Sequence, residues 1–105
     1  MEKMTQGKEF ERTPKLQLKV DEKIKVRLAG KRNYSNQDYG TSLICDFVTP
    51  DGKKYHKFVS ERISLFTIMN NANIGDTFLL HLKQGQGNRK FYEVYSLTNE
   101  EFEMK

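Results

Sequence analysis

The stretch that most constrains the fold is Thr49-Pro50-Asp51-Gly52, which separates two β-forming segments at 41–49 and 53–60. Proline presets the backbone angle at the second turn position, and glycine adopts the left-handed conformation that closes the turn. The stretch therefore predicts a β-hairpin with a three-residue Pro-Asp-Gly loop.

The loop length also decides which residues share a face of the hairpin. Phe47 then faces Tyr55, and Cys45 faces Lys57. One face presents Leu43, Cys45, Phe47, Tyr55, Lys57 and Val59, and the other presents Ile44, Asp46, Val48, Lys54, His56 and Phe58. Neither face is cleanly apolar.

The charged residues favour one orientation of this hairpin. Burying Lys57 without a partner costs on the order of several kcal/mol, whereas Asp46 and His56 can satisfy each other near the end of a barrel. We therefore expect Phe47, Tyr55 and Lys57 to face outward. The alternative orientation places Phe47 and Tyr55 in the core.

Three further strands and one helix are expected along the chain. DEKIKVRLAG (21–30), DTFLLHLK (76–83) and FYEVYSL (91–97) have the period of strands, and ERISLFTIMNNAN (61–73) has that of a helix, with Ser60 able to cap its start. Five strands with one helix between the third and fourth is the element order of the OB-fold, a mainly β, five-stranded Greek-key barrel. The expected core comprises Ile24, Val26, Leu28, Ile44, Phe58, Leu65, Met69, Phe78, Leu80, Leu82 and Val94.

We expect a flexible arm at 1–19, one OB-fold domain at 20–98 and an acidic tail at 99–105. The net charge is +4, and three of the 14 acidic residues fall in the tail, so the domain is more basic than the whole chain. Basic domains attract polyanions. No apolar signal core or long apolar run is present, so we expect a soluble protein of the cytoplasm, or of the host cytoplasm if a phage encodes it.

The motifs of an enzyme are absent from this sequence. It contains no P-loop, GxSxG or HExxH motif, and Cys45, His56 and His81 do not form a zinc-binding set. We expect a non-enzymatic protein without a cofactor or metal.

A nucleic-acid-binding function accounts for more of the aromatic and basic residues in the sequence than an enzymatic function does. GKRNYSNQDYG (30–40) is expected to be a loop between the first two strands, and QGQGNRK (84–90) a hairpin tip between the last two. In an OB barrel these loops flank the face of the second and third strands. The candidate nucleic-acid-binding residues are Lys31, Arg32, Tyr34, Tyr39, Phe47, Tyr55, Lys57, Arg89, Lys90 and Tyr92. Aromatic rings stack on unpaired bases, while lysine and arginine hold phosphates.

From about residue 20 to 98, the layout resembles the OB-fold single-stranded DNA-binding proteins of bacteria and, in its compact size, those of bacteriophages. KKYHKFVS (53–60) is similar to their third-strand segment. The resemblance implies a stacking role for Tyr55 and a phosphate role for Lys57. The chain departs from the bacterial proteins in lacking tryptophan and a long glycine-rich linker.

The sequence thus predicts a protein that coats single-stranded DNA, with little sequence preference, in replication, recombination or repair. The acidic tail, which contains Phe102, resembles tails that recruit replication or recombination proteins. The alternatives are a frayed, solvated terminus and a Phe102 side chain that docks on its own barrel. The first expected strand, with its alternating lysines, either forms the edge of a homodimer or is kept from pairing by those same charges. Two alternatives are an RNA-binding OB domain and a protein-interaction module that docks an acidic partner.

Overall fold

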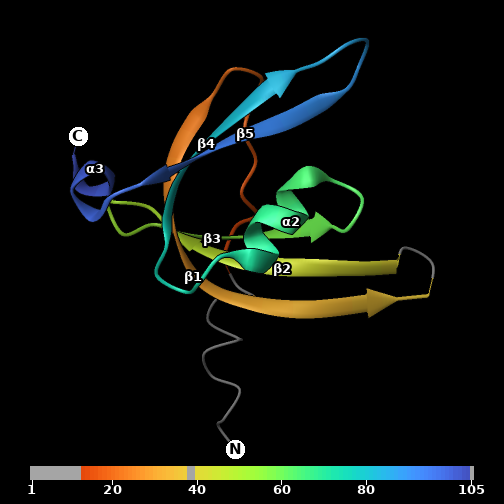
Figure 1. Cartoon of the computed structure of the whole chain (residues 1–105), viewed down its shortest axis with the longest axis horizontal. Coiled ribbons are helices and arrows are strands. Elements are labelled where there is room, and N and C mark those ends of the chain that lie inside the picture. Colours follow the sequence, from red (N-terminus) through yellow and green to blue (C-terminus); the bar gives the residue numbers. More distant parts are fainter. Residues whose placement is uncertain (1–12, 38–39, 105) are drawn as a thin grey trace, which may run out of the picture.

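Five antiparallel strands form one sheet in the order β3-β2-β1-β4-β5, as Figure 1 shows. The structure, a computed structural model, describes residues 13–37 and 40–104. The elements are β1 (Lys23–Asn36), β2 (Gly40–Val48), β3 (Lys54–Ser60), α2 (Ser64–Asn71), β4 (Thr77–Gln84), β5 (Lys90–Leu97) and α3 (Asn99–Glu103). The expected mainly β fold, with a helix between the third and fourth strands, is confirmed. In the described part of the chain, β3 and β5 lie at opposite edges of the sheet, which is not closed.

Strand β1 connects the two halves of the sheet. Its residues 23–27 pair with β4 and its residues 27–36 pair with β2, with a shift in register between Leu28 and Gly30. A bulge of this kind bends a strand and increases its twist. In the strand order β1 lies between β2 and β4, and the homodimer edge suggested for this strand stays a prediction.

The prediction of a loop at 30–40 is largely wrong, because residues 30–36 continue β1 and pair with β2. These residues are polar on both faces, so the apolar alternation that identifies a half-buried strand is missing from them. Their strand conformation comes from the ladder with β2, in which Lys31 pairs with Cys45 and Tyr34 pairs with Ser42.

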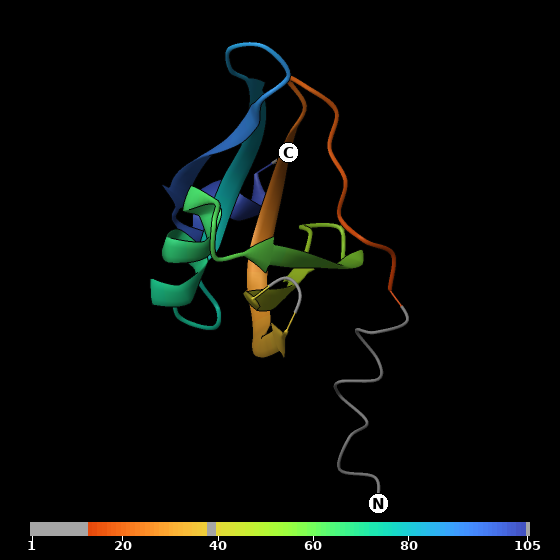
Figure 2. The same ribbon diagram turned by 90° about the vertical axis from the view of Figure 1, so that its right-hand side faces the viewer.

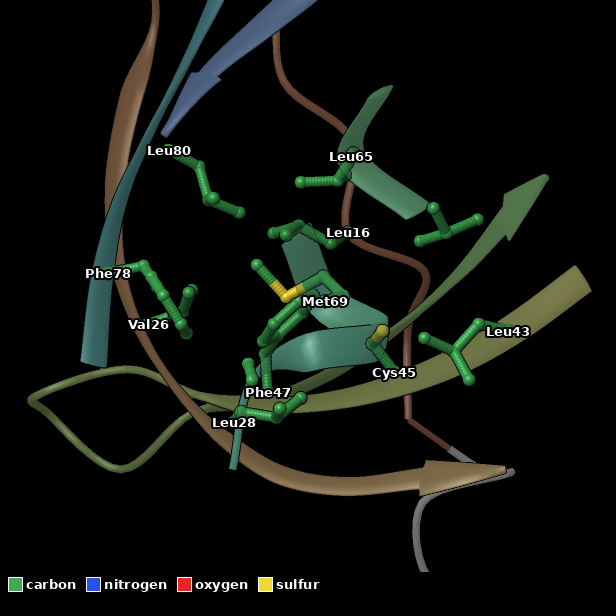
Figure 3. Close-up of a cluster of buried hydrophobic side chains, with 12 residues drawn as sticks. Leu16, Val26, Leu28, Leu43, Cys45, Phe47, Leu65, Met69, Phe78 and Leu80 are labelled. Atoms are coloured by element: carbon green, nitrogen blue, oxygen red, sulfur yellow. The ribbon is translucent and has the colours of Figure 1, made fainter. Parts of the chain in front are cut away.

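The β2–β3 hairpin has the expected register, with Phe47 opposite Tyr55 and Cys45 opposite Lys57. The orientation that we favoured is wrong. Phe47 and Cys45 are fully buried, whereas Phe58, expected in the core, is 46% exposed. Figure 3 shows Phe47 and Cys45 pointing into the same cluster as Met69. Ile44 is only partly buried on the outer side.

The side chain of Lys57 explains why the buried face tolerates a lysine. β3 is an edge strand, and the Lys57 Nζ atom lies 4.9 Å from the centre of the Tyr92 ring on β5. A cation over an aromatic face is stabilised by the ring, and a long aliphatic stem lets the charge reach the sheet edge. The desolvation penalty that guided the expectation is therefore largely avoided.

Helix α2 lies between the β4–β5 pair and the β2–β3 pair in Figure 1. It is shorter than the expected 61–73, and Ser60 does not cap it, because the Ser60 Oγ atom accepts from the Arg62 N–H in the preceding turn. Leu65 and Met69 are buried as expected, and Met69 reaches the centre of the core in Figure 3. Ile68 is exposed.

The N-terminal part of the described chain belongs to the fold before residue 20. Leu16 is 3% exposed and lies in the core cluster. Its N–H donates to the His56 carbonyl at 2.8 Å, and the His56 N–H donates to the Pro14 carbonyl at 3.1 Å. Figure 2 shows this segment running along the side of the molecule that β3 reaches. Residues 1–12 of the expected arm lie outside the described residues.

The expected acidic tail forms α3, which packs against the sheet. Thr98 and Glu101 form a capping box, with the Glu101 N–H donating to Thr98 Oγ1 at 3.1 Å and the Thr98 N–H donating to Glu101 Oε1 at 2.9 Å. Phe102 is buried, and the Arg27 guanidinium lies 4.8 Å from its ring centre. Phe102 therefore docks on its own domain, which is one of the alternatives expected for this residue, and the recruitment of partners by the tail stays a prediction.

The two phenylalanines of the hairpin provide a test of its orientation. Phe47→Ala should lower the free energy of unfolding by about 3 to 5 kcal/mol, because it leaves a cavity in the core. Phe58→Ala should lower it by less than about 1 kcal/mol, because the ring is half exposed. Urea denaturation followed by circular dichroism measures both, and a larger loss for Phe58→Ala would show that the orientation is inverted.

Candidate functional site

Two exposed aromatic rings lie together on the outer side of β1, β2 and β3. Tyr34 is 43% exposed and Phe58 is 46% exposed, and their ring centres are 5.9 Å apart with an interplanar angle of 85°. The ring centre of His56 lies 6.1 Å from the ring centre of Phe58 on the same strand. We call the surface formed by Tyr34 and Phe58, with the buried His56 ring beneath it, the aromatic face. The edge-to-face contact holds the Tyr34 and Phe58 rings in a fixed arrangement.

Strand alternation explains why these three side chains share a face. Tyr34 pairs with Ser42, and Phe58 pairs with Ile44, so both rings lie on the side of the sheet to which Ser42 and Ile44 point. Because successive residues point to opposite sides of a strand, Phe47 and Tyr34 are on opposite sides of the sheet.

Three basic residues lie around the aromatic face. The Lys15 Nζ atom is 5.7 Å from the centre of the Phe58 ring. Arg32 is two residues from Tyr34 on β1, and Lys54 is two residues from His56 on β3, so each points to the outer side. The face thus combines aromatic rings with positive charge.

A polar network supports this face from below. Asp46 is 4% exposed, and the Arg32 Nη2 atom lies 2.8 Å from its Oδ1 atom. His56, paired with Asp46 across the hairpin, is also buried, and its Nδ1 atom lies 3.0 Å from the Thr13 hydroxyl. A Cβ atom at Gly30 would lie 3.0 Å from the Asp46 carboxylate, so glycine keeps this space open. The ion pair fixes Arg32 next to Tyr34 and offsets part of its charge.

Lys31, expected to bind phosphate, has a structural role instead. Its Nζ atom lies 2.7 Å from the Ala72 carbonyl, 3.0 Å from that of Asn70 and 3.3 Å from that of Met69. A cation at the C-terminus of a helix satisfies carbonyls that lack an intrahelical partner. Lys31 therefore anchors α2 to β1 and points away from the aromatic face.

Other expected site residues are dispersed over the structure. Phe47 is wrong as a stacking residue because it is buried, and Tyr55 packs against the core. Lys57 and Tyr92 contact each other across the β3 and β5 edges. The remaining three are Arg89 and Lys90, which are exposed at the β4–β5 hairpin, and Tyr39, which lies outside the described residues.

A second pair of exposed aromatics, Phe91 and Tyr95, lies on β5. Between them is Glu93, whose Oε1 atom accepts a hydrogen bond from the Tyr95 hydroxyl at 2.7 Å. This bond and the nearby Lys83 lower the pKa of Glu93, and the same bond raises the pKa of Tyr95. A carboxylate that stays ionised between two rings repels phosphate, so this surface suits nucleic acid less well than the aromatic face.

The larger cavities lie elsewhere in the molecule. One of about 740 Å³ is lined by Arg27, Pro50, Phe102 and Met104 among others, and one of about 410 Å³ is lined by Lys23, Ile24, Pro50 and Tyr55 among others. Neither contains a residue of the aromatic face. In the described ranges, no three His, Cys, Asp or Glu side chains gather where they could hold a metal ion.

Sequence analysis missed four residues at this site: Lys15, Lys54, His56 and Phe58. Phe58 was assigned to the core because of the orientation chosen for Lys57. Lys15 is brought to β3 by a single parallel bridge with His56, for which a local pattern gives no signal. The alternation of Lys54, His56 and Phe58 along β3 was visible, and the opposite choice of face would have found all three.

Comparisons with protein-family models, curated proteins and solved structures find no match to this chain. Within the part of the chain that is described, none of the helices has the length and apolar character needed to cross a membrane. The assignment of function therefore depends on the geometry of the aromatic face.

Lys31→Met tests the structural role of this lysine. The substitution keeps the aliphatic stem but removes the ammonium group from three helix carbonyls, and hydrogen bonds to charged groups are worth about 1.5 to 3 kcal/mol. We expect the free energy of unfolding to fall by about 1 to 3 kcal/mol. Lys23→Met, at an exposed position of the same strand, serves as the control. Equal stability of the two variants in urea would contradict the anchoring role.

The reactivity of the Cys45 thiol provides a chemical test of the orientation of β2. Burial, and then the negative charge of Asp46, raise the pKa of its thiol from 9.0 to about 12. The reactive thiolate is therefore scarce at pH 8, and we expect iodoacetamide to label the native protein at least about 100-fold more slowly than the unfolded chain. Similar rates in buffer and in guanidinium chloride would mean that Cys45 faces outward.

Proposed function

We propose that this protein binds single-stranded DNA on the aromatic face, with little sequence preference. The observation that carries the proposal is the Tyr34–Phe58 pair, two half-exposed rings held 5.9 Å apart on one side of the sheet. Every base has a π-face, so rings of this kind stack on unpaired bases of any sequence. A duplex hides those faces, which gives a preference for single strands.

The charges around the rings support the same function. Lys15, Arg32 and Lys54 border the face, and the chain carries a net charge of +4. Cations beside stacking rings neutralise the phosphates that follow each base. The Asp46 carboxylate offsets part of the positive charge of Arg32, so we assign a larger electrostatic contribution to Lys15 than to Arg32.

We also propose that the sheet is an OB-fold. The strand order β3-β2-β1-β4-β5, the bulged β1 shared by both halves, and α2 between β3 and β4 support this assignment. In that fold the outer side of the second and third strands takes oligonucleotides, and Phe58 lies there. The proposal keeps the resemblance to single-stranded DNA-binding proteins, with Phe58 in place of Tyr55 as the stacking residue of β3.

The main experiment compares single-stranded and duplex DNA. Fluorescence anisotropy with labelled oligo-dT should show binding that weakens steeply as salt rises, and much weaker binding to a duplex of the same length. Oligo-U, measured in parallel, separates DNA binding from RNA binding. Equal affinity for oligo-dT and duplex, or affinity independent of salt, would refute the proposal.

Substitution of the two rings locates the site. Tyr34→Ala and Phe58→Ala should each weaken oligo-dT binding by about 1 to 3 kcal/mol, because each removes one stacking platform. Phe91→Ala and Tyr95→Ala remove equally exposed rings from β5 and serve as matched controls. If the control variants lose affinity while the first pair does not, the nucleic acid binds the β5 surface.

A further inference from the structure

A small cavity opens at the edge of β3 beside the aromatic face. Its volume is about 190 Å³, and its lining residues are Lys15, Leu16, Gln17, Lys57 and Phe58. The cavity lies between the N-terminal segment and β3, so residues more than 40 positions apart in sequence form its walls. Two of the five lining side chains are lysines.

The backbone of β3 also contributes to this cavity. The N–H and C=O of His56 bond to Pro14 and Leu16, so they point away from β2. Alternate residues of a strand present these groups to the same edge, and those of Phe58 therefore point to this edge as well. The parallel pairing is a single bridge at Lys15 and His56, so Phe58 lies one step past it.

The two lysines approach the cavity from opposite sides of the sheet. Lys15 is exposed, and its Nζ atom is 5.7 Å from the Phe58 ring centre on the outer side. Lys57 comes from the inner side, where its Nζ atom lies 4.9 Å from the Tyr92 ring centre. Two ammonium groups together with a backbone N–H make a favourable environment for an anion.

We infer that this cavity is a phosphate-binding subsite for the backbone of the bound strand. The inference rests on the proposed function and extends it by naming where one phosphate sits. A phosphate held by Lys15, Lys57 and the Phe58 N–H places the adjoining base next to the Phe58 ring. The N-terminal segment is then a wall of the binding site as well as a cover for the edge of β3.

A salt titration of a double variant tests this subsite. For single strands, each phosphate contact adds about 0.7 to the slope of log K against log salt. Because both lysines hold the same phosphate, Lys15→Gln combined with Lys57→Gln should reduce the slope for oligo-dT by about 0.7. Lys19→Gln combined with Lys23→Gln removes the same charge at exposed positions outside the cavity and should change the slope much less. Circular dichroism establishes that both variants are folded.

A second measurement detects the subsite without DNA. Titration of the labelled protein with inorganic pyrophosphate should shift the amide resonance of Phe58 in the unaltered protein, and the shift should disappear in the Lys15→Gln, Lys57→Gln variant. Equal slopes for the two double variants together with no shift at Phe58 would overturn the subsite while leaving DNA binding intact. Absence of oligo-dT binding by the unaltered protein would instead refute the proposed function, and the pyrophosphate result would then stand alone.

Discussion

The bulge in β1 is the feature on which the rest of the arrangement depends. Before it, β1 pairs with β4; after it, β1 pairs with β2, and the register shift lies between Leu28 and Gly30. The bend lets both halves of one sheet surround a single core that includes Leu28 and Phe47. It also sets which residues of the second half face outward, because a change of one residue in register reverses every side chain.

The outer face of that second half depends on a few polar contacts. Gly30 leaves room for the Asp46 carboxylate, and Asp46 binds Arg32 at 2.8 Å. On the other side of the sheet, Lys31 holds the end of α2. Neighbouring basic residues of one strand thus have different roles: Lys31 stabilises the fold, and Arg32 lies beside the Tyr34 ring. This separation could not be deduced from the pair Lys31-Arg32 in the sequence, where both were assigned to phosphate.

Local patterns predicted much of the fold. The turn at 49–52 predicted the hairpin and its register, including Phe47 opposite Tyr55, because turn chemistry is a short-range property. The orientation of the hairpin was not predictable in the same way, because it depends on Tyr92, a ring far along the chain that accommodates the Lys57 charge.

The C-terminal helix could have been predicted from a local signal in the sequence that our prediction did not use. Thr98 and Glu101 have capping-box spacing, which predicts a helix start in a segment that we treated as a tail. At the N-terminus the position of Lys15 was not accessible from the sequence, because one bridge and the burial of Leu16 bring it to β3. The candidate site therefore combines one predicted ring, Tyr34, with residues that only the tertiary structure brings together.

Nuclear magnetic resonance of the aromatic side chains during a titration with oligo-dT would locate the binding surface at the level of single rings. The structure and the proposed function together predict that the ring resonances of Tyr34 and Phe58 shift, while those of buried Phe47 and of Phe91 and Tyr95 on β5 change little. Shifts confined to Phe91 and Tyr95, or unchanged resonances for Tyr34 and Phe58 at saturating oligo-dT, would contradict the assignment of the aromatic face as the binding site.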